Sequence, residues 1–243
     1  MGARLDTLRK KGIWAKYKPL DYLKRSLIAL ASFCLIAISN VMSLNADLGA
    51  RPDNSLYVGI SNHTGLTVGQ ASQIFTLAII VINLFFRIYP ALGTLMDMFF
   101  VGYFMDWIMA LGWLPMPVTL LGKLVLLVLS VPVLAIGVGL YMNMKIGEGP
   151  RDGLMLALSE KYHWKISTVR VSIDVLLLAF AFLLGGPIGI GTVLLAVLPG
   201  FFVERALKAF VYPFKKEYLK AFFTNRLPEE TEAAAAAEEK PPA

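Results

Sequence analysis

Six blocks of apolar residues, each about as long as a bilayer-spanning helix, dominate this sequence. The blocks lie at about 26–45, 69–88, 91–112, 119–143, 166–185 and 189–212. A helix needs about 20 mostly apolar residues to cross the hydrocarbon core of a bilayer. Only 16% of the residues are charged, whereas a soluble domain carries about 25%. The blocks therefore predict an all-α polytopic membrane protein.

Positive charges are distributed unevenly between the segments that join these blocks. If the N-terminus is cytoplasmic and the chain crosses six times, 21 of the 23 Lys and Arg residues fall on the cytoplasmic side, and only Arg51 and Lys123 fall outside. Cytoplasmic loops of membrane proteins carry such an excess of Lys and Arg. We therefore expect a protein of the bacterial cytoplasmic (inner) membrane with both termini in the cytoplasm. Topology explains the net charge of +6 better than nucleic-acid binding does.

The two ends of the chain differ from its apolar middle. Residues 1–25 combine eight Lys and Arg with Leu, Trp and Tyr, which predicts a basic segment on the cytoplasmic membrane surface rather than a cleaved signal peptide. Residues 213–243 are first basic and then rich in Glu, Ala and Pro, a composition typical of a disordered tail. Between these ends we predict two units, 26–118 and 119–212.

An internal repeat relates the two units. A shift of 98 residues aligns Asn45 with Asn143, Gly49 with Gly147, Pro52 with Pro150, Leu56 with Leu154, Ser61 with Ser159, Gly93 and Thr94 with Gly191 and Thr192, and Gly102 with Gly200. Most of these identities are residues that require a particular backbone geometry, so they indicate a duplication. Each unit holds three spans, and an odd number places the second unit upside down. We therefore expect six transmembrane helices as two inverted three-helix repeats.

Each unit also contains a loop and a helical piece too short to span. The loops are 48–56 and 146–154, and the short pieces are about 54–64 and 152–162. Pro150 suits the first position of a helix, and Asp152 in the first turn complements the free N–H groups and the helix dipole. Pieces of about 16 Å predict broken or re-entrant segments whose N-termini would attract an anion. The alternative is a surface loop whose acid only caps its helix.

The loop motifs resemble those of a known family. Gly147-Glu148-Gly149-Pro150-Arg151-Asp152-Gly153-Leu154-Met155 and Gly189-Ile190-Gly191-Thr192-Val193 resemble the YczE-like group of the YczE/YyaS/YitT-type bacterial integral membrane proteins. The resemblance covers about 40–212, and it includes a Leu-Gly-Ala-Arg-Pro stretch at 48–52. Asp53 and Asn54 stand where the family often has Trp-Asp. Because the family is largely uncharacterised, the resemblance implies a fold and a membrane location but no substrate.

The candidate site residues come from the two loops and from polar positions in the apolar blocks. For substrate binding they are Arg51, Asp53, Asn54, Arg151, Asp152, Thr94 and Thr192, and for coupling they are Asp174 and Asp97. Ionisable groups at membrane depth are costly and mark functional sites. Two structural alternatives remain open: the threonines allow close helix packing, and Asp174 pairs with Arg170 one helical turn earlier.

These observations favour a small secondary transporter or exporter of a polar or anionic metabolite, bound between the inverted repeats and coupled to protons through Asp174 or Asp97. A non-transporting scaffold or partner subunit is the alternative. No enzyme motif is present in the sequence, and His63 and His163 make a poor metal site. We therefore expect no catalysis, cofactor or metal. The expected partners are the lipid bilayer and an unknown small molecule, and the sequence leaves open whether the chain forms a homo-oligomer.

Overall fold

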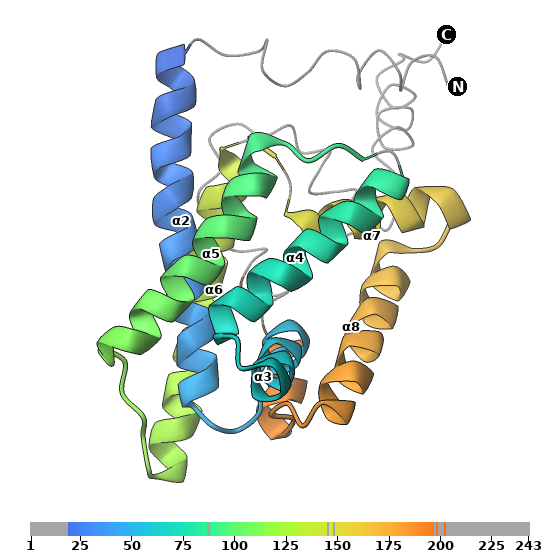
Figure 1. The fold of residues 1–243 in the computed structure, drawn as a ribbon. Helices are drawn as coiled ribbons and strands as arrows, with labels where there is room; N and C mark the ends of the chain where they lie inside the picture. The colour runs from blue at the N-terminus through green and yellow to red at the C-terminus, as the bar shows by residue number, and fades with distance from the viewer. Residues whose placement is uncertain are drawn as a thin grey trace, which may run out of the picture.

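The described part of the chain is α-helical and contains no strand. A computed structural model describes residues 19–86, 88–144, 146, 147, 149–196, 198 and 202. Its helices are α2 (Pro19–Asn45), α3 (Pro52–Thr64), α4 (Val68–Phe85), α5 (Leu92–Leu111), α6 (Leu120–Asn143), α7 (Pro150–Tyr162) and α8 (Ile166–Leu183) (Figure 1). Residues 190–196 are also helical. Residues 1–18 of the predicted basic segment, most of the sixth predicted span and the tail 213–243 lie outside the described residues.

Four helical stretches are long and apolar enough to cross a membrane. They are Leu23–Asn45, Val68–Phe85, Leu92–Leu111 and Leu120–Asn143. These stretches agree within a few residues with the first four predicted blocks, and α8 covers most of the fifth. Helix α2 begins at Pro19, so residues 19–25 continue the first long helix. The prediction of an all-α membrane protein is thereby confirmed.

Helix α2 packs against α5 and α6. A small residue lets α6 come close: a Cβ added at Gly137 would lie 2.9 Å from the Ile36 side chain. The hydroxyl of Ser39 donates to the Ser130 carbonyl across the same interface at 2.7 Å. Small residues and interhelical hydrogen bonds stabilise helix contacts in membranes, where hydrophobic burial between helices gives little driving force.

The connecting loops gather at two ends of the bundle. At one end, Ala50 N–H donates to the Pro187 carbonyl at 3.2 Å, and Lys123 pairs with Asp47. At the other end, Arg25 donates to the Met144 carbonyl at 2.8 Å. In Figure 1 the start of α2 lies at the top and its end lies at the bottom. The loops 46–51 and 184–189 therefore share one end, while 144 lies at the other.

The short helices α3 and α7 have the same length and matching ends. Each has 13 residues and begins at a proline, and their bounds differ by 98. The bounds of α4 and α8 differ by the same number. The residues that follow the short helices, Gly65 and His163, both adopt the left-handed conformation, with φ of 70° and 54°. Local structure thus recurs wherever the two units can be compared here.

At two places, also 98 residues apart, a glycine of one unit lies against a loop of the other unit. We call these two contacts the glycine crossings. Gly191 N–H donates to the Leu48 carbonyl at 2.7 Å, and Gly93 N–H donates to the Ile146 carbonyl at 3.0 Å. Each bond joins residues of different units. Positions 191 and 93, and positions 48 and 146, are each 98 residues apart. The paired bonds make the two crossings equivalent in position.

Asp106, an acid near the end of α5, stabilises the start of α4. Its carboxylate accepts hydrogen bonds from Gly69 N–H at 2.8 Å and from the Thr67 hydroxyl. Thr67 and Gln70 also form a reciprocal capping box. Carboxylates at a helix N-terminus satisfy free N–H groups and complement the dipole. The position of Asp106 therefore has a structural explanation.

Candidate functional site

The N-termini of α3 and α7 form the framework of the candidate site. Both helices have proline and an acid in their first turn: Asp53 directly follows Pro52 in α3, and Asp152 lies two residues after Pro150 in α7. The capping residues are Arg51 and Gly149, and neither provides a side-chain cap within the described region. The predicted helix start at Pro150 is confirmed. Pro52 and Pro150 have no N–H, and the Asp53 carboxylate accepts hydrogen bonds from the next N–H groups of α3, those of Asp53 and Asn54.

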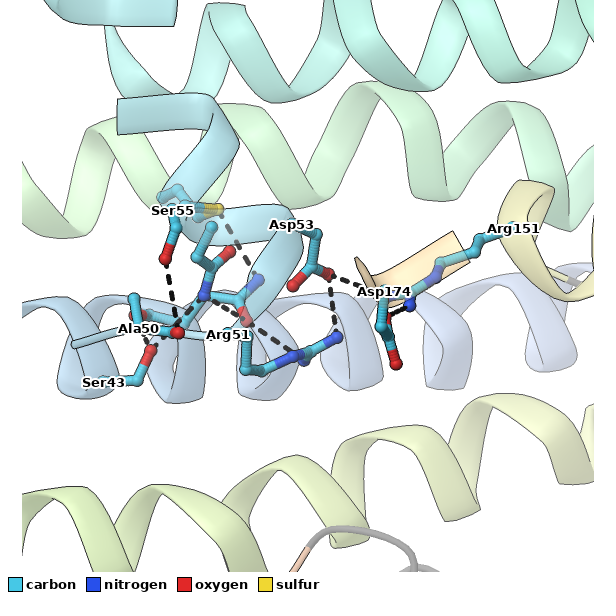
Figure 2. Close-up of polar contacts among 10 residues, drawn as sticks. Ser43, Ala50, Arg51, Asp53, Ser55, Arg151 and Asp174 are labelled. Atoms are coloured by element: carbon cyan, nitrogen blue, oxygen red, sulfur yellow. Dashed lines mark hydrogen bonds and ion pairs between the residues drawn. The ribbon is translucent and has the colours of Figure 1, made fainter. Parts of the chain in front are cut away.

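Four predicted site residues meet in one ion-pair network between these helices. Arg51 Nη2 lies 2.8 Å from Asp53 Oδ2, and Arg151 Nη1 lies 3.7 Å from the same oxygen. Arg151 also pairs with Asp174 of α8 through its other terminal nitrogen. Figure 2 shows Arg151 reaching across to Asp174, with Asp53 between the two arginines. The network links the first turns of α3 and α7 with the middle of α8.

The Asp53–Arg151 contact joins equivalent positions of the two units. The two residues are 98 positions apart. Identical charges at two positions in contact would repel each other. The chain has opposite charges at these positions, so the contact becomes attractive. The attraction between Asp53 and Arg151 explains why one loop has an acid at this position and the other loop has a base.

Amide side chains surround the network. Asn40 of α2 accepts through Oδ1 from Asn54 Nδ2 at 3.2 Å and from Arg51 Nη1 at 3.4 Å. Asn54 Nδ2 also lies 3.3 Å from the Ser43 hydroxyl. Near α7, Asn83 Nδ2 donates to the Pro150 carbonyl at 2.8 Å. Both short helices therefore begin alongside polar residues of longer helices.

Burial and neighbouring charge act in opposite directions on the two loop acids. Burial alone would raise the pKa of Asp53, but Arg51, Arg151 and backbone hydrogen bonds lower that pKa below its ordinary value. Burial raises the pKa of Asp152, against the lowering effect of Arg151, Arg170 and Arg51. Asp53 is consequently held as a carboxylate, whereas Asp152 takes up a proton more readily than an exposed acid does.

Several buried polar atoms at the site have no hydrogen-bond partner within the described part of the chain. They are Asp53 Oδ1, Asn54 Oδ1, Asn83 Oδ1 and Arg151 Nε. Buried polar groups normally have partners, so each exception needs an explanation, such as water or a ligand. Both a donor and acceptors remain, which suits a polar ligand.

The remaining predicted residues divide into two groups. Asp97 of α5 lies within electrostatic range of Asp152 and Arg51, so it borders the network. Thr94 and Thr192 lie instead at the glycine crossings: a Cβ added at Gly147 would meet Thr94 Oγ1 at 3.2 Å, and one at Gly49 would meet Thr192 Oγ1 at 2.6 Å. This location favours the packing alternative for both threonines.

The predicted partner of Asp174 differs from the one in the structure. Sequence spacing offered Arg170, one turn earlier in α8, whereas the ion pair of Asp174 is with Arg151 of α7. Arg170 interacts electrostatically with Asp152 instead. Distance along the chain identified a residue on the same helix, but the long Arg151 side chain reaches Asp174 through space.

Sequence reasoning missed Asn40, Ser43 and Asn83. Each lies within or at the edge of an apolar block and is buried. An amide inside an apolar helix is a signal similar to the one that identified Asp174, and it could have been used. Among the described residues, no group of three or more His, Cys, Asp and Glu could hold a metal ion.

Comparisons with known proteins place the chain in a family. The model of the family of unknown function DUF6198 matches residues 23–208. The chain is 37% identical over 161 residues to the uncharacterized membrane protein YczE of Bacillus subtilis, covering 66% of this chain and 74% of YczE. It is 29% identical over 193 residues to an uncharacterized protein of Haemophilus influenzae, covering 79% and 85% of the two chains.

A third relative is the uncharacterized protein YyaS of Bacillus subtilis, which is 28% identical over 168 residues, covering 68% of this chain and 84% of YyaS. No solved structure matches the chain. The likeness to YczE and YyaS confirms the resemblance that the loop motifs indicated. The chain therefore belongs to the DUF6198 family, as a member of the YczE-like group of bacterial integral membrane proteins.

Proposed function

We propose that this protein is a small secondary transporter of an anionic metabolite, built from two inverted three-span repeats. The observation that carries the proposal is the contact between Asp53 and Arg151. It joins the first turns of two short helices that lie 98 residues apart in the sequence. Many transporters bind substrate at such a repeat interface, where broken helices present their N-termini to an anion.

The arrangement of the loops supports inversion of the repeats. Loop 46–51 and the described residues 144, 146 and 147 occupy equivalent positions in the two units, and their contacts lie at opposite ends of the bundle. Exposed aromatic residues occur near both ends, with Trp107 and Trp113 at one and Tyr89 and Trp164 at the other. Trp and Tyr favour the membrane–water interfaces. The ion-pair network would then lie between these interfaces.

The charged interior favours transport over the scaffold alternative. A scaffold has no need for ionisable groups inside the bilayer, because apolar packing holds its helices together. Here Arg51, Asp53, Arg151 and Asp174 meet where three helices converge. Charges at membrane depth cost free energy and persist where they serve a substrate or ion pathway.

Flux through reconstituted protein tests the proposal. The full-length protein in liposomes should take up small organic anions, and Arg151→Gln should abolish the uptake. Asp47→Asn serves as the matched control, because it removes a carboxylate from an ion pair at the bundle end, 2.6 Å from Lys123. We expect this control to transport normally. Absence of flux for every anion, cation and neutral metabolite tested would leave the scaffold function in its place.

A further inference from the structure

We propose that the ligand of this site is a small organic carboxylate, and that it binds together with one proton, which Asp174 takes up when Arg151 exchanges Asp174 for the ligand. This inference deepens the proposed transport function and rests on it. It assigns a chemical class to the ligand and a distinct role to each of the two acids that contact Arg151.

The arginines define the ligand class. Arg51 and Arg151 are both mostly buried, with 21% and 23% of their side chains exposed, and both bind carboxylates of the protein itself. The planar guanidinium fork matches the planar carboxylate group. Arg151 also keeps a buried Nε with no hydrogen-bond partner among the described residues. A ligand carboxylate therefore finds donors that already bind its own chemical group.

Asp174 is the acid that a ligand can displace. Asp53 contacts both arginines and has 11% of its side chain exposed. Asp174 contacts Arg151 alone in this network and has 21% exposed. Release of Asp174 therefore breaks one ion pair, whereas release of Asp53 breaks two. Asp53 continues to hold Arg51 and Arg151 in place while the ligand binds.

Charge balance requires the proton. In the network Arg51 and Arg151 are balanced by Asp53 and Asp174. A carboxylate ligand adds one negative charge, and the displaced Asp174 carboxylate would then lie buried without its ion-pair partner, which is costly. A proton from the aqueous phase binds to Asp174 and removes this charge. The site gains one anion and one proton, its net charge does not change, and no covalent bond forms or breaks except the O–H bond on Asp174.

Arg151 pairs directly with Asp174, and further charged and titratable groups surround this arginine. They are Asp152 of α7, Arg51 at the start of α3, Asp53 and Tyr57 of α3, Arg170 of α8 and, next to Asp152, Asp97 of α5. Among these, Asp152 and Asp97 are the other acids able to accept a proton. The test must therefore separate Asp174 from both.

Calorimetry on the full-length protein in detergent makes this separation. Sodium propionate and sodium succinate are titrated into the protein between pH 6 and 8, in buffers with different ionisation enthalpies. We expect about one proton taken up per carboxylate bound, so Kd should rise about tenfold per pH unit. Asp174→Asn mimics the protonated acid, so it should bind with no proton uptake and a Kd independent of pH. Asp47→Asn should behave like the unmodified protein, and Arg151→Lys should recover part of the binding lost in Arg151→Gln.

Three results would overturn the inference: no carboxylate binding, tighter binding of sodium phosphate or ammonium chloride than of either carboxylate, or an unchanged pH dependence in Asp174→Asn. The last result would assign the proton to another acid, Asp152 or Asp97. The outcome is separable from that of the transport proposal. Carboxylate binding without liposome flux disproves transport alone, and flux restricted to phosphate disproves the carboxylate inference alone.

Discussion

At the scale of single residues, the site depends on one asymmetry between two related loops. Positions 53 and 151 are equivalent, yet one is Asp and the other is Arg. The sequence predicted that both loops carry site residues, but it did not predict that these two would contact each other. Such a contact depends on how the helices pack against one another, which local sequence patterns do not specify.

Arg151 should contribute more to stability than a cation in an exposed ion pair. Arg151→Gln removes the ion-pair partner of the mostly buried Asp174, and breaking a buried pair costs about 3–5 kcal/mol. Lys123→Gln breaks the pair with Asp47, whose side chain is 78% exposed, and such pairs contribute at most about 1 kcal/mol. Thermal unfolding in detergent should show a clearly larger decrease in Tm for Arg151→Gln. Equal decreases would mean that the network is well solvated.

At the scale of elements, the sequence predicted helices better than it predicted their neighbours. Apolar length located the long helices, and Pro150 with Asp152 two residues on located the start of α7. These features act within a few residues, so a local pattern contains them. The amide residues Asn40 and Asn83 were missed because their role is to contact the first turns of other helices, at Asn54 and Pro150. Such contacts follow from helix packing, which local patterns do not specify.

Gly49, which lies against the backbone of Gly189, should tolerate no side chain. A Cβ there would lie 2.4 Å from the backbone nitrogen of Gly189, and φ is +97°. Gly65 also has a positive φ, of +70°, but a Cβ there meets nothing within 4 Å. Gly65→Ala should therefore cost only the conformational strain of about 1–2 kcal/mol.

Gly49→Ala adds to this strain a clash with backbone that cannot move aside. We expect little folded protein for Gly49→Ala and near-normal yield for Gly65→Ala, measured by size-exclusion chromatography of detergent extracts. Equal yields for the two variants would show that α3 and the 184–189 loop separate easily, contrary to the packing described above.

At the scale of the whole molecule, the charge count and the structure have to be considered together. Two of the arginines in the count, Arg51 and Arg151, belong to the interior network rather than to exposed loops. The count places Arg51 outside and Arg151 in the cytoplasm. Leaving both out removes one positive charge from each side, so the cytoplasmic excess of Lys and Arg stays the same. The expected orientation therefore rests on the chain ends and on loops such as 161–165. Orientation is set during membrane insertion, and it calls for a measurement in cells.

Cysteine labelling tests both the orientation and the inversion of the repeats. The one native cysteine, Cys34, is first replaced by alanine. Tyr89→Cys and Ile188→Cys then place single thiols in the equivalent loops 86–91 and 184–189, where both native side chains are exposed. Val118→Cys, at a residue that is 95% exposed, marks the loop between α5 and α6. Inverted repeats with a cytoplasmic N-terminus place Ile188 and Val118 outside and Tyr89 inside.

A membrane-impermeant maleimide added to intact cells should therefore label the cysteines at 118 and 188, and it should label the one at 89 only after the cells are broken. The pair at 89 and 188 decides the symmetry, because parallel repeats would expose both thiols on the same side. Labelling of 89 alone in intact cells would keep the inversion but reverse the orientation. Labelling of both or of neither would contradict inverted repeats, and the site would then lack the two-fold relation that brings Asp53 to Arg151.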